Sequence, residues 1–267
     1  MNPTDRSPTT WLGRDRVAFE QCGSTNDEAA RLAEEGARHG TIVTARAQSA
    51  GRGRHGRSWF SPTDENLYLS CLLRPTCAPS QAPPLTLAAG MGVVDAVNQL
   101  ELRGDRSGDT PVRAILEWPN DVVIDGRKVA GVLTEMSTRG TQLEYVVVGI
   151  GVNLATRSFP PELEPLATSL YLAGLSVERT GFLESLLGHL EGWFNRFFAR
   201  GSRALISAWM QRAEVAPGQL GRRVDATTEH GPIVGRITGL EVDGRLQVTD
   251  NDGRVHVVMA GVVEYRD

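Results

Sequence analysis

The stretch Gln48–Trp59 carries three glycines and three arginines, and it separates two apolar segments of the chain. It reads Gln-Ser-Ala-Gly-Arg-Gly-Arg-His-Gly-Arg-Ser-Trp, and no acidic residue lies between Glu35 and Asp64. Glycine lets backbone amides approach a ligand closely, and each arginine offers a planar fork that matches phosphate or carboxylate oxygens. The pattern therefore predicts a loop that binds an anion and stays mobile until the anion orders it.

This loop by itself leaves two other interpretations open. Arg-Gly runs also occur in flexible RNA-binding segments, and a glycine-rich basic loop is often a solvated connector. The chain of 267 residues holds 28 basic and 32 acidic residues, for a net charge of −4. Because the positive charge is local, a small anionic ligand fits better than a nucleic-acid duplex, and we expect no DNA partner.

Composition favours a globular protein of the cytoplasm. Hydrophobic residues make up 40% of the chain, which is enough for a sizeable core. The three cysteines show no C-x-x-C spacing, which favours a reducing compartment and gives no sign of structural zinc. No stretch approaches the roughly 18 apolar residues of a membrane span, and the N-terminus lacks the apolar core of a signal peptide, so we expect no membrane partner.

The order of helix-like and strand-like segments predicts an α+β fold, in which a mixed β-sheet is backed by helices. Helices are expected over about 25–36 and 85–100, around 182–198 and near 202–213; strands are expected over 41–48 and 66–74 and, as a meander, within 114–153. Asp125-Gly126 marks a hairpin turn inside the meander. Between 182 and 198, aromatic residues and leucines share one helical face, which is typical of core packing rather than of a cofactor site.

The character of the sequence changes near residue 215. Residues 1–15 are polar and contain two prolines, so they are expected to form a flexible leader ahead of a large domain over 16–215. After Pro217-Gly218, short alternating strands are broken by glycine-containing turns. This pattern predicts a small all-β domain over 216–267.

Four motifs, read in order, resemble the biotin protein ligase family. They are Gly23-Ser-Thr-Asn26, the loop from Gly51 to Trp59, Trp118-Pro-Asn-Asp121 followed by Gly126-Arg-Lys-Val-Ala-Gly131, and Gly149-Ile-Gly-Val-Asn153. The match covers residues 20–155 closely, and the C-terminal β domain resembles the SH3-like β-barrel of that biotin/lipoate ligase fold. The resemblance implies an ATP-dependent ligase that makes biotinyl-5′-AMP from biotin and MgATP with release of pyrophosphate. Biotin then passes to a lysine of a biotin carboxyl carrier protein.

The resemblance also implies roles for individual residues. Lys128 and Arg54 would neutralise the carboxylate and the α-phosphate as these approach each other, and Asp121 would orient or deprotonate the acceptor lysine. The implied biotin-binding residues are Ser24, Thr25, Asn26, Gln48, Gly51, Arg52, Gly53, Lys128, Gly131 and Gly149. The implied ATP and adenylate residues are Arg54, Arg57, Trp59, Asn120, Lys128, Gly151 and Asn153. Mg²⁺ follows from the nucleotide chemistry, but no motif designates its ligands.

Each of these motifs has a structural interpretation as well. Ser24 and Thr25 suit the start of a helix, residues 119–121 suit a turn, and the glycines suit bulges in a sheet. One position also departs from the family pattern, which usually reads Lys-Trp-Pro-Asn-Asp, because this chain has Glu117 at the first place. Either Glu117 points away from the triphosphate or nucleotide handling differs here.

Two related functions stay open: a lipoate or octanoate ligase of the same fold, and a biotin- or adenylate-binding protein without turnover. Only 23 residues precede Ser24, too few for a DNA-binding domain of about 60 residues, so a ligase without repressor function is expected. A homodimer through an exposed sheet edge is also compatible with this sequence.

Overall fold

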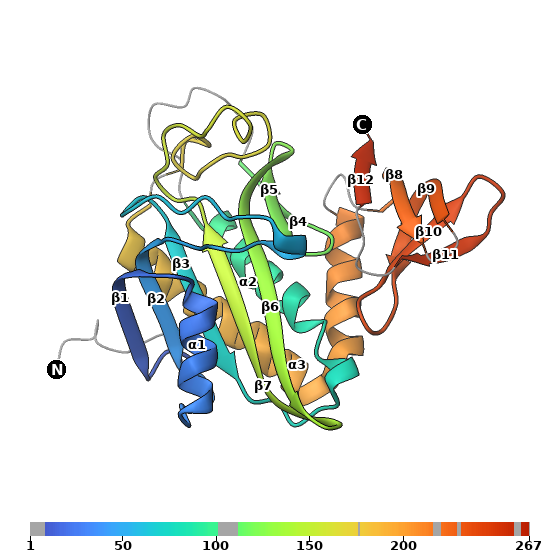
Figure 1. The fold of residues 1–267 in the computed structure, drawn as a ribbon. Helices are drawn as coiled ribbons and strands as arrows, with labels where there is room; N and C mark the ends of the chain where they lie inside the picture. The colour runs from blue at the N-terminus through green and yellow to red at the C-terminus, as the bar shows by residue number, and fades with distance from the viewer. Residues whose placement is uncertain are drawn as a thin grey trace.

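The computed structural model describes residues 9–100, 112–175, 177–215, 220–228, 231–258 and 263–266. These residues form a seven-stranded mixed sheet, three α-helices and a five-stranded antiparallel sheet (Figure 1). The arrangement confirms the predicted α+β class. Among the described residues, no helix is both long and apolar enough to cross a membrane.

The large sheet has the strand order β1-β2-β3-β7-β6-β5-β4. Its strands are β1 Arg16–Cys22, β2 Ile42–Gln48, β3 Leu67–Leu73, β4 Ala114–Glu117, β5 Asp121–Ile124, β6 Arg127–Arg139 and β7 Gln142–Val152. Only β1 and β2 pair in parallel, and all other neighbours are antiparallel. Every residue of β3 is buried at the centre of the sheet, which explains why its sequence is apolar apart from Ser70.

Helices cover both faces of the large sheet (Figure 1). On one face lies α1 (Thr25–Glu34), whose Ala29 and Ala33 pack against β2 and β3. On the other lie α2 (Leu85–Asn98) and α3 (Arg179–Val215). Gly201 interrupts α3 with a φ of 69°, so the two helices expected near 182–198 and 202–213 follow each other across a kink. The aromatic face of the first one is core, apart from Phe198 at its rim.

The described part of the predicted flexible leader is fixed, because a buried glutamate binds it. The Glu191 carboxylate on α3 accepts the backbone N–H groups of Thr10, Trp11 and Leu12 at 2.7, 2.9 and 2.8 Å. Leu12 is fully buried in the core. The expectation for residues 9–15 was therefore wrong, since a single acid 180 residues away satisfies three amides of an otherwise polar segment. Residues 1–8 lie outside the described part of the chain.

Replacing Glu191 with glutamine is expected to lower the free energy of unfolding by about 1–3 kcal/mol at pH 7, because charge-assisted hydrogen bonds weaken. Burial opposes ionisation of Glu191, but the three amide donors hold its pKa below the ordinary value. A depressed folded-state pKa stabilises the fold above the unfolded value of about 4.3 and loses that contribution as the pH falls through the folded pKa.

Urea denaturation of wild type and Glu191→Gln at pH 7 and at pH 3 measures this effect. The stability difference should be largest at pH 7 and shrink in acid. The exposed Glu34→Gln is the matched control and should change stability by less than about 0.5 kcal/mol. A Glu191→Gln difference that grows as the pH falls would contradict the account.

The second sheet has the order β11-β10-β9-β8-β12. Its strands are β8 Arg223–Thr228, β9 Gly231–Leu240, β10 Leu246–Asp250, β11 Val255–Val258 and β12 Val263–Arg266. This sheet is consistent with the predicted SH3-like barrel, and its buried residues join the core cluster that contains α3. The predicted boundary at 215 and 216 stays a proposal, and residues 216–219 lie outside the described part.

Candidate active site

A cavity of about 460 Å³ opens on the large sheet, and its size suits a small-molecule site. It is lined by all but one of the residues predicted for the site: Ser24, Thr25, Asn26, Gln48, Arg52, Gly53, Arg54, Arg57, Trp59, Asn120, Asp121, Lys128, Gly131, Gly149, Gly151 and Asn153. The exception, Gly51, accepts the backbone N–H of Trp59 at 2.9 Å, and a Cβ there would lie 2.6 Å from the Ser61 hydroxyl oxygen. Five separate segments of the chain thus meet at one place, while the role of each residue stays a prediction.

A neutral, hydrogen-bonding group of side chains lies at the start of α1. Ser24 is the N-cap of the helix and accepts the backbone N–H of Asn26 at 3.3 Å. The backbone N–H and hydroxyl of Thr25 both donate to the Gln48 side-chain oxygen, at 2.8 and 3.2 Å. The Ser70 hydroxyl on β3 lies 2.8 Å from the Thr25 hydroxyl and 2.6 Å from the Asn26 side-chain oxygen. Capping and a polar pocket therefore coexist here.

Asn26 sits directly on the sheet because Gly149 leaves room for it. A Cβ at Gly149 would lie only 2.2 Å from the Asn26 side-chain oxygen. Gly149 pairs with Ser70 across β3 and β7, so the strands present a glycine and a hydroxyl beneath the amide. The Asn26 side-chain N–H donates to Glu135 at 2.6 Å. Gly149 was predicted to let the backbone approach a ligand. In the structure its missing Cβ makes room for the Asn26 side chain.

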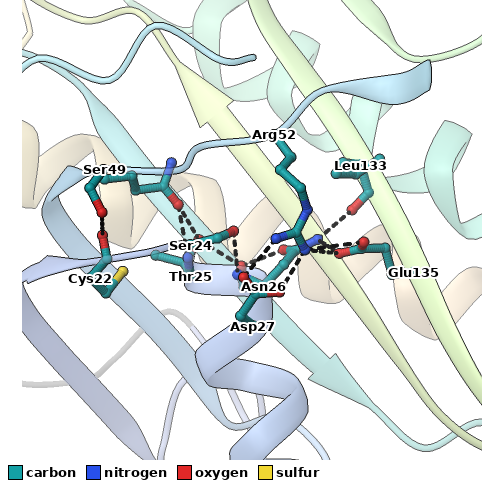
Figure 2. Close-up of polar contacts among 11 residues, drawn as sticks. Cys22, Ser24, Thr25, Asn26, Asp27, Ser49, Arg52, Leu133 and Glu135 are labelled. Atoms are coloured by element: carbon teal, nitrogen blue, oxygen red, sulfur yellow. Dashed lines mark hydrogen bonds and ion pairs between the residues drawn. The ribbon is translucent and has the colours of Figure 1, made fainter. Parts of the chain in front are cut away.

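Two carboxylates hold Arg52, although no acidic residue lies near it in the sequence between Glu35 and Asp64. The guanidinium donates to both oxygens of Asp27 at 2.6 Å and to Glu135 at 3.2 Å. Figure 2 shows Arg52 reaching from the loop to the first turn of α1 and to β6. The two acids lie 25 and 83 residues away from Arg52 in the sequence, so no local pattern reveals these contacts.

The catalytic residues predicted from the motifs gather at the other end of the cavity. The Lys128 ammonium lies 2.6 Å from an Asp121 carboxylate oxygen and 5.3 Å from the centre of the Trp59 ring. Arg54 donates to the Asn120 side-chain oxygen at 3.1 Å. Burial lowers the pKa of Arg54, with Asp121 acting in the opposite direction, and the group stays cationic. One end of the cavity therefore holds uncharged hydrogen-bonding groups beside Arg52, which Asp27 and Glu135 neutralise, and is called the neutral end. The other end, with Lys128 and Arg54, is called the cationic end.

Trp59 lies against two glycines that face each other across β6 and β7. Gly131 pairs with Gly151 in the strand register. A Cβ at Gly151 would come within 2.5 Å of the indole, and one at Gly131 within 3.1 Å. The indole N–H is buried and has no hydrogen-bond partner among the described residues. The two glycines therefore form a flat floor for an aromatic ring.

Three of the residues predicted for the site form hydrogen bonds within the protein. They are Gly53, Arg57 and Asn153. Gly53 donates its backbone N–H to the Arg57 carbonyl at 2.7 Å, which closes the short 3₁₀ turn Arg54–Gly56. The Asn153 side chain donates to the Thr168 carbonyl at 3.0 Å. Its predicted contact with adenine or ribose stays untested.

Several site residues escaped prediction from the sequence. They are Asp27, Ser70, Glu135, Arg222 and Tyr265. Ser70 had a visible signal, since it is the one small polar residue inside the apolar run Leu67–Leu73. The others are ordinary polar residues whose partners lie far away in the chain.

No group of three or more His, Cys, Asp or Glu side chains in the described residues is placed to hold a metal ion. The side chains of Asn120 and Asp121 nevertheless supply hard oxygen donors at the cationic end of the cavity. Such a sparse set suits Mg²⁺, which is commonly bound by one or two carboxylates together with substrate phosphates.

Comparison with known protein families finds two matches in this chain. Residues 18–153 match the biotin/lipoate A/B protein ligase family, and residues 220–266 match the biotin protein ligase C-terminal domain. The chain belongs to the biotin/lipoate A/B protein ligase family. All the segments that line the neutral and cationic ends of the cavity up to Asn153 fall within the first match.

Individual members of this ligase family cover most of the chain. A biotin–[acetyl-CoA-carboxylase] ligase from Mycobacterium tuberculosis is 35% identical over 95% of this chain and 89% of its own length. Another from Paracoccus denitrificans is 34% identical over 90% of this chain and 96% of its own. The structure of the biotin protein ligase from Aquifex aeolicus in complex with biotin and ATP has a TM-score of 0.75 at 28% identity, covering 95% of this chain and 99% of that one.

Proposed function

We propose that this protein is an ATP-dependent biotin protein ligase. It activates biotin to biotinyl-5′-AMP with release of pyrophosphate and then transfers biotin to a lysine of a carboxyl carrier protein. The observation that carries the proposal is the polarity of the cavity, in which a buried neutral hydrogen-bonding end faces an end holding Lys128 and Arg54. The relatives named as biotin–[acetyl-CoA-carboxylase] ligases support the same reading.

In the first step, two anions must meet: the biotin carboxylate and the α-phosphate of ATP. Their repulsion falls when fixed cations lie beside the reacting atoms. We assign this role to Lys128, whose flexible stem reaches over Trp59, and to Arg54, which Asn120 orients. Mg²⁺ held by the ATP phosphates with Asn120 and Asp121 would neutralise further phosphate charge.

In the second step, the acceptor lysine must lose a proton before it attacks the activated carbonyl. We assign Asp121 to orient this amine or accept its proton, because its carboxylate lines the cavity beside Lys128. Transfer then breaks the bond between the biotinyl carbonyl and the phosphate, and AMP leaves with the bonding electrons. We propose a biotin carboxyl carrier protein as the acceptor.

The neutral end of the cavity favours biotin over lipoate or octanoate. The ureido ring of biotin is uncharged but has N–H donors and a carbonyl acceptor. Thr25, Asn26 and Gln48 supply amide and hydroxyl groups there, all of them within the cavity. An apolar acyl chain offers no hydrogen-bonding group to these side chains, whereas the ureido ring offers both donors and an acceptor.

We further propose that the ligase works in the cytoplasm, without DNA, and that any homodimer uses an edge of the large sheet. The local positive charge within a net charge of −4 supports the absence of a DNA partner. The three cysteines without C-x-x-C spacing support a reducing compartment such as the cytoplasm. Strands β1 and β4 form the two edges of that sheet in the described residues. Sedimentation at several protein concentrations tests the dimer.

Exchange of labelled pyrophosphate into ATP tests the activation step. We expect exchange that requires biotin and Mg²⁺ and that is at least about 100-fold faster with biotin than with lipoate or octanoate. Faster exchange with lipoate would support the alternative ligase. Binding of biotin without any exchange would support the binding protein that lacks turnover.

A further inference from the structure

The turn Glu117–Asp121 joins β4 to β5 and has two sides with different partners. Glu117 and Asp121 lie opposite each other where the two strands pair. Asn120 and Asp121 contact Arg54 and Lys128 in the cavity. The beginning of the turn instead contacts the C-terminal sheet, so five consecutive residues connect this sheet to the cations of the site.

Three contacts fix the beginning of the turn to the C-terminal sheet and its connections, from Arg222 just before β8, from Gly244 between β9 and β10 and from Tyr265 on β12. The Arg222 guanidinium donates to the Glu117 carboxylate at 2.7 Å. The Tyr265 hydroxyl donates to the Trp118 carbonyl at 2.9 Å, and the Trp118 indole N–H donates to the Gly244 carbonyl at 2.8 Å. The Glu117 carboxylate, the Trp118 carbonyl and the Trp118 indole are therefore all bound by residues of the C-terminal part of the chain.

Arg222 and Tyr265 also support each other. The guanidinium of Arg222 lies 4.4 Å from the centre of the Tyr265 ring, as in a cation–π contact. The side chains of Arg222 and Glu117 are only 21% and 18% exposed. Removal of one partner of such a shielded pair leaves the other charge uncompensated, which is more damaging than loss of the pair as a whole.

The pair also accounts for the departure of this chain from the family pattern. Glu117 lines the cavity, but its carboxylate is neutralised by a cation from the C-terminal sheet. The negative charge is therefore not offered to the triphosphate. The place usually held by a lysine is occupied by an ion pair whose positive member comes from another part of the chain.

We propose that Glu117, Arg222 and Tyr265 are positioning residues, through which the C-terminal sheet sets the placement of Asn120 and Asp121 and so of Arg54 and Lys128. This inference rests on the proposed function. Because Asn120 and Asp121 contact Arg54 and Lys128 at the cationic end of the cavity, we expect the turn to affect the handling of MgATP much more than the binding of biotin. The C-terminal sheet is thus a working part of the nucleotide site.

Steady-state adenylate formation tests the proposal in Arg222→Gln, in Glu117→Gln and in the charge-swapped double variant Glu117→Arg/Arg222→Glu. Each single variant should lower kcat/KM for MgATP about tenfold, with KM for biotin within twofold of wild type. The charge swap should recover most of this loss. Tyr265→Phe should lower kcat/KM for MgATP in the same direction, because it removes only the hydrogen bond to Trp118. Arg223→Gln, which removes an exposed neighbouring cation, is the control.

Three results would overturn the inference. The first is kcat/KM for MgATP at the wild-type level in both single variants. The second is a charge-swapped variant as impaired as Arg222→Gln while Tyr265→Phe is fully active. The third is KM for biotin rising in parallel with the loss for MgATP, which would indicate general unfolding. Failure of the proposed function would look different, since wild type itself would then form no adenylate.

Discussion

Replacing Lys128 with alanine is expected to slow biotinyl-AMP formation about 100- to 1000-fold, the usual loss when one preorganised donor to a developing charge is removed. Lys128 follows the two-residue turn of the β5–β6 hairpin, and its backbone is fixed by hydrogen bonds to residues 166 and 168. Its ammonium lies between Asp121 and the Trp59 ring. The fixed backbone and flexible side chain allow it to follow negative charge from the carboxylate to the phosphate.

The matched control is Arg127→Ala, which removes an exposed cation from the neighbouring position of β6. Quenched-flow measurement of adenylate formation should show wild-type rates in this control. KM for biotin should change much less than kcat in Lys128→Ala, because the proposed role is in the transition state. Equal rates in Lys128→Ala and wild type would remove this residue from the mechanism.

Replacing Gly149 with alanine is expected to weaken biotin binding about 100-fold. The new Cβ would lie 2.2 Å from the Asn26 side-chain oxygen, so Asn26 must leave the sheet. Its contacts to Ser70 and Glu135 would then be lost together with its proposed contact to the ureido ring. Overpacking of this kind also costs about 1–3 kcal/mol of stability.

Isothermal titration with biotin measures the affinity, and thermal unfolding measures the stability. Gly192→Ala is the matched control, because a Cβ there meets nothing within 4 Å in the middle of α3. That change should leave biotin affinity unchanged and raise stability by up to about 1 kcal/mol. Unchanged biotin affinity in Gly149→Ala would show that Asn26 has no part in binding.

The sequence predicted the helices, strands and turns that depend on interactions between residues close together in the chain. The Asp125-Gly126 hairpin is found where expected, with positive φ values of 50° and 71° as a tight two-residue turn requires. The buried strand β3 follows from its run of apolar residues, in which Ser70 is the only small polar one. Strand β1 was not predicted, because its charged and apolar residues lie at the sheet edge and it depends on parallel pairing with β2.

Prediction of the site from local sequence signals was limited in the same way. The motifs located the cavity because each contributes residues whose chemistry is visible in the local sequence. The partners of Arg52 and of Glu117 were not predictable, since Glu135 and Arg222 approach them only in the folded chain. Ion pairs between distant segments have no periodicity, spacing or composition that a single sequence reveals.

Intact-mass measurement of a biotin carboxyl carrier domain tests the central claim most directly. The domain is incubated with this protein, biotin and MgATP, in parallel with Lys128→Ala and with a reaction that lacks ATP. We predict a mass increase of one biotinyl group that requires ATP and is lost in the variant. A carrier domain that stays unmodified, with no biotinyl-AMP formed by the wild-type protein, would contradict the assignment as a ligase.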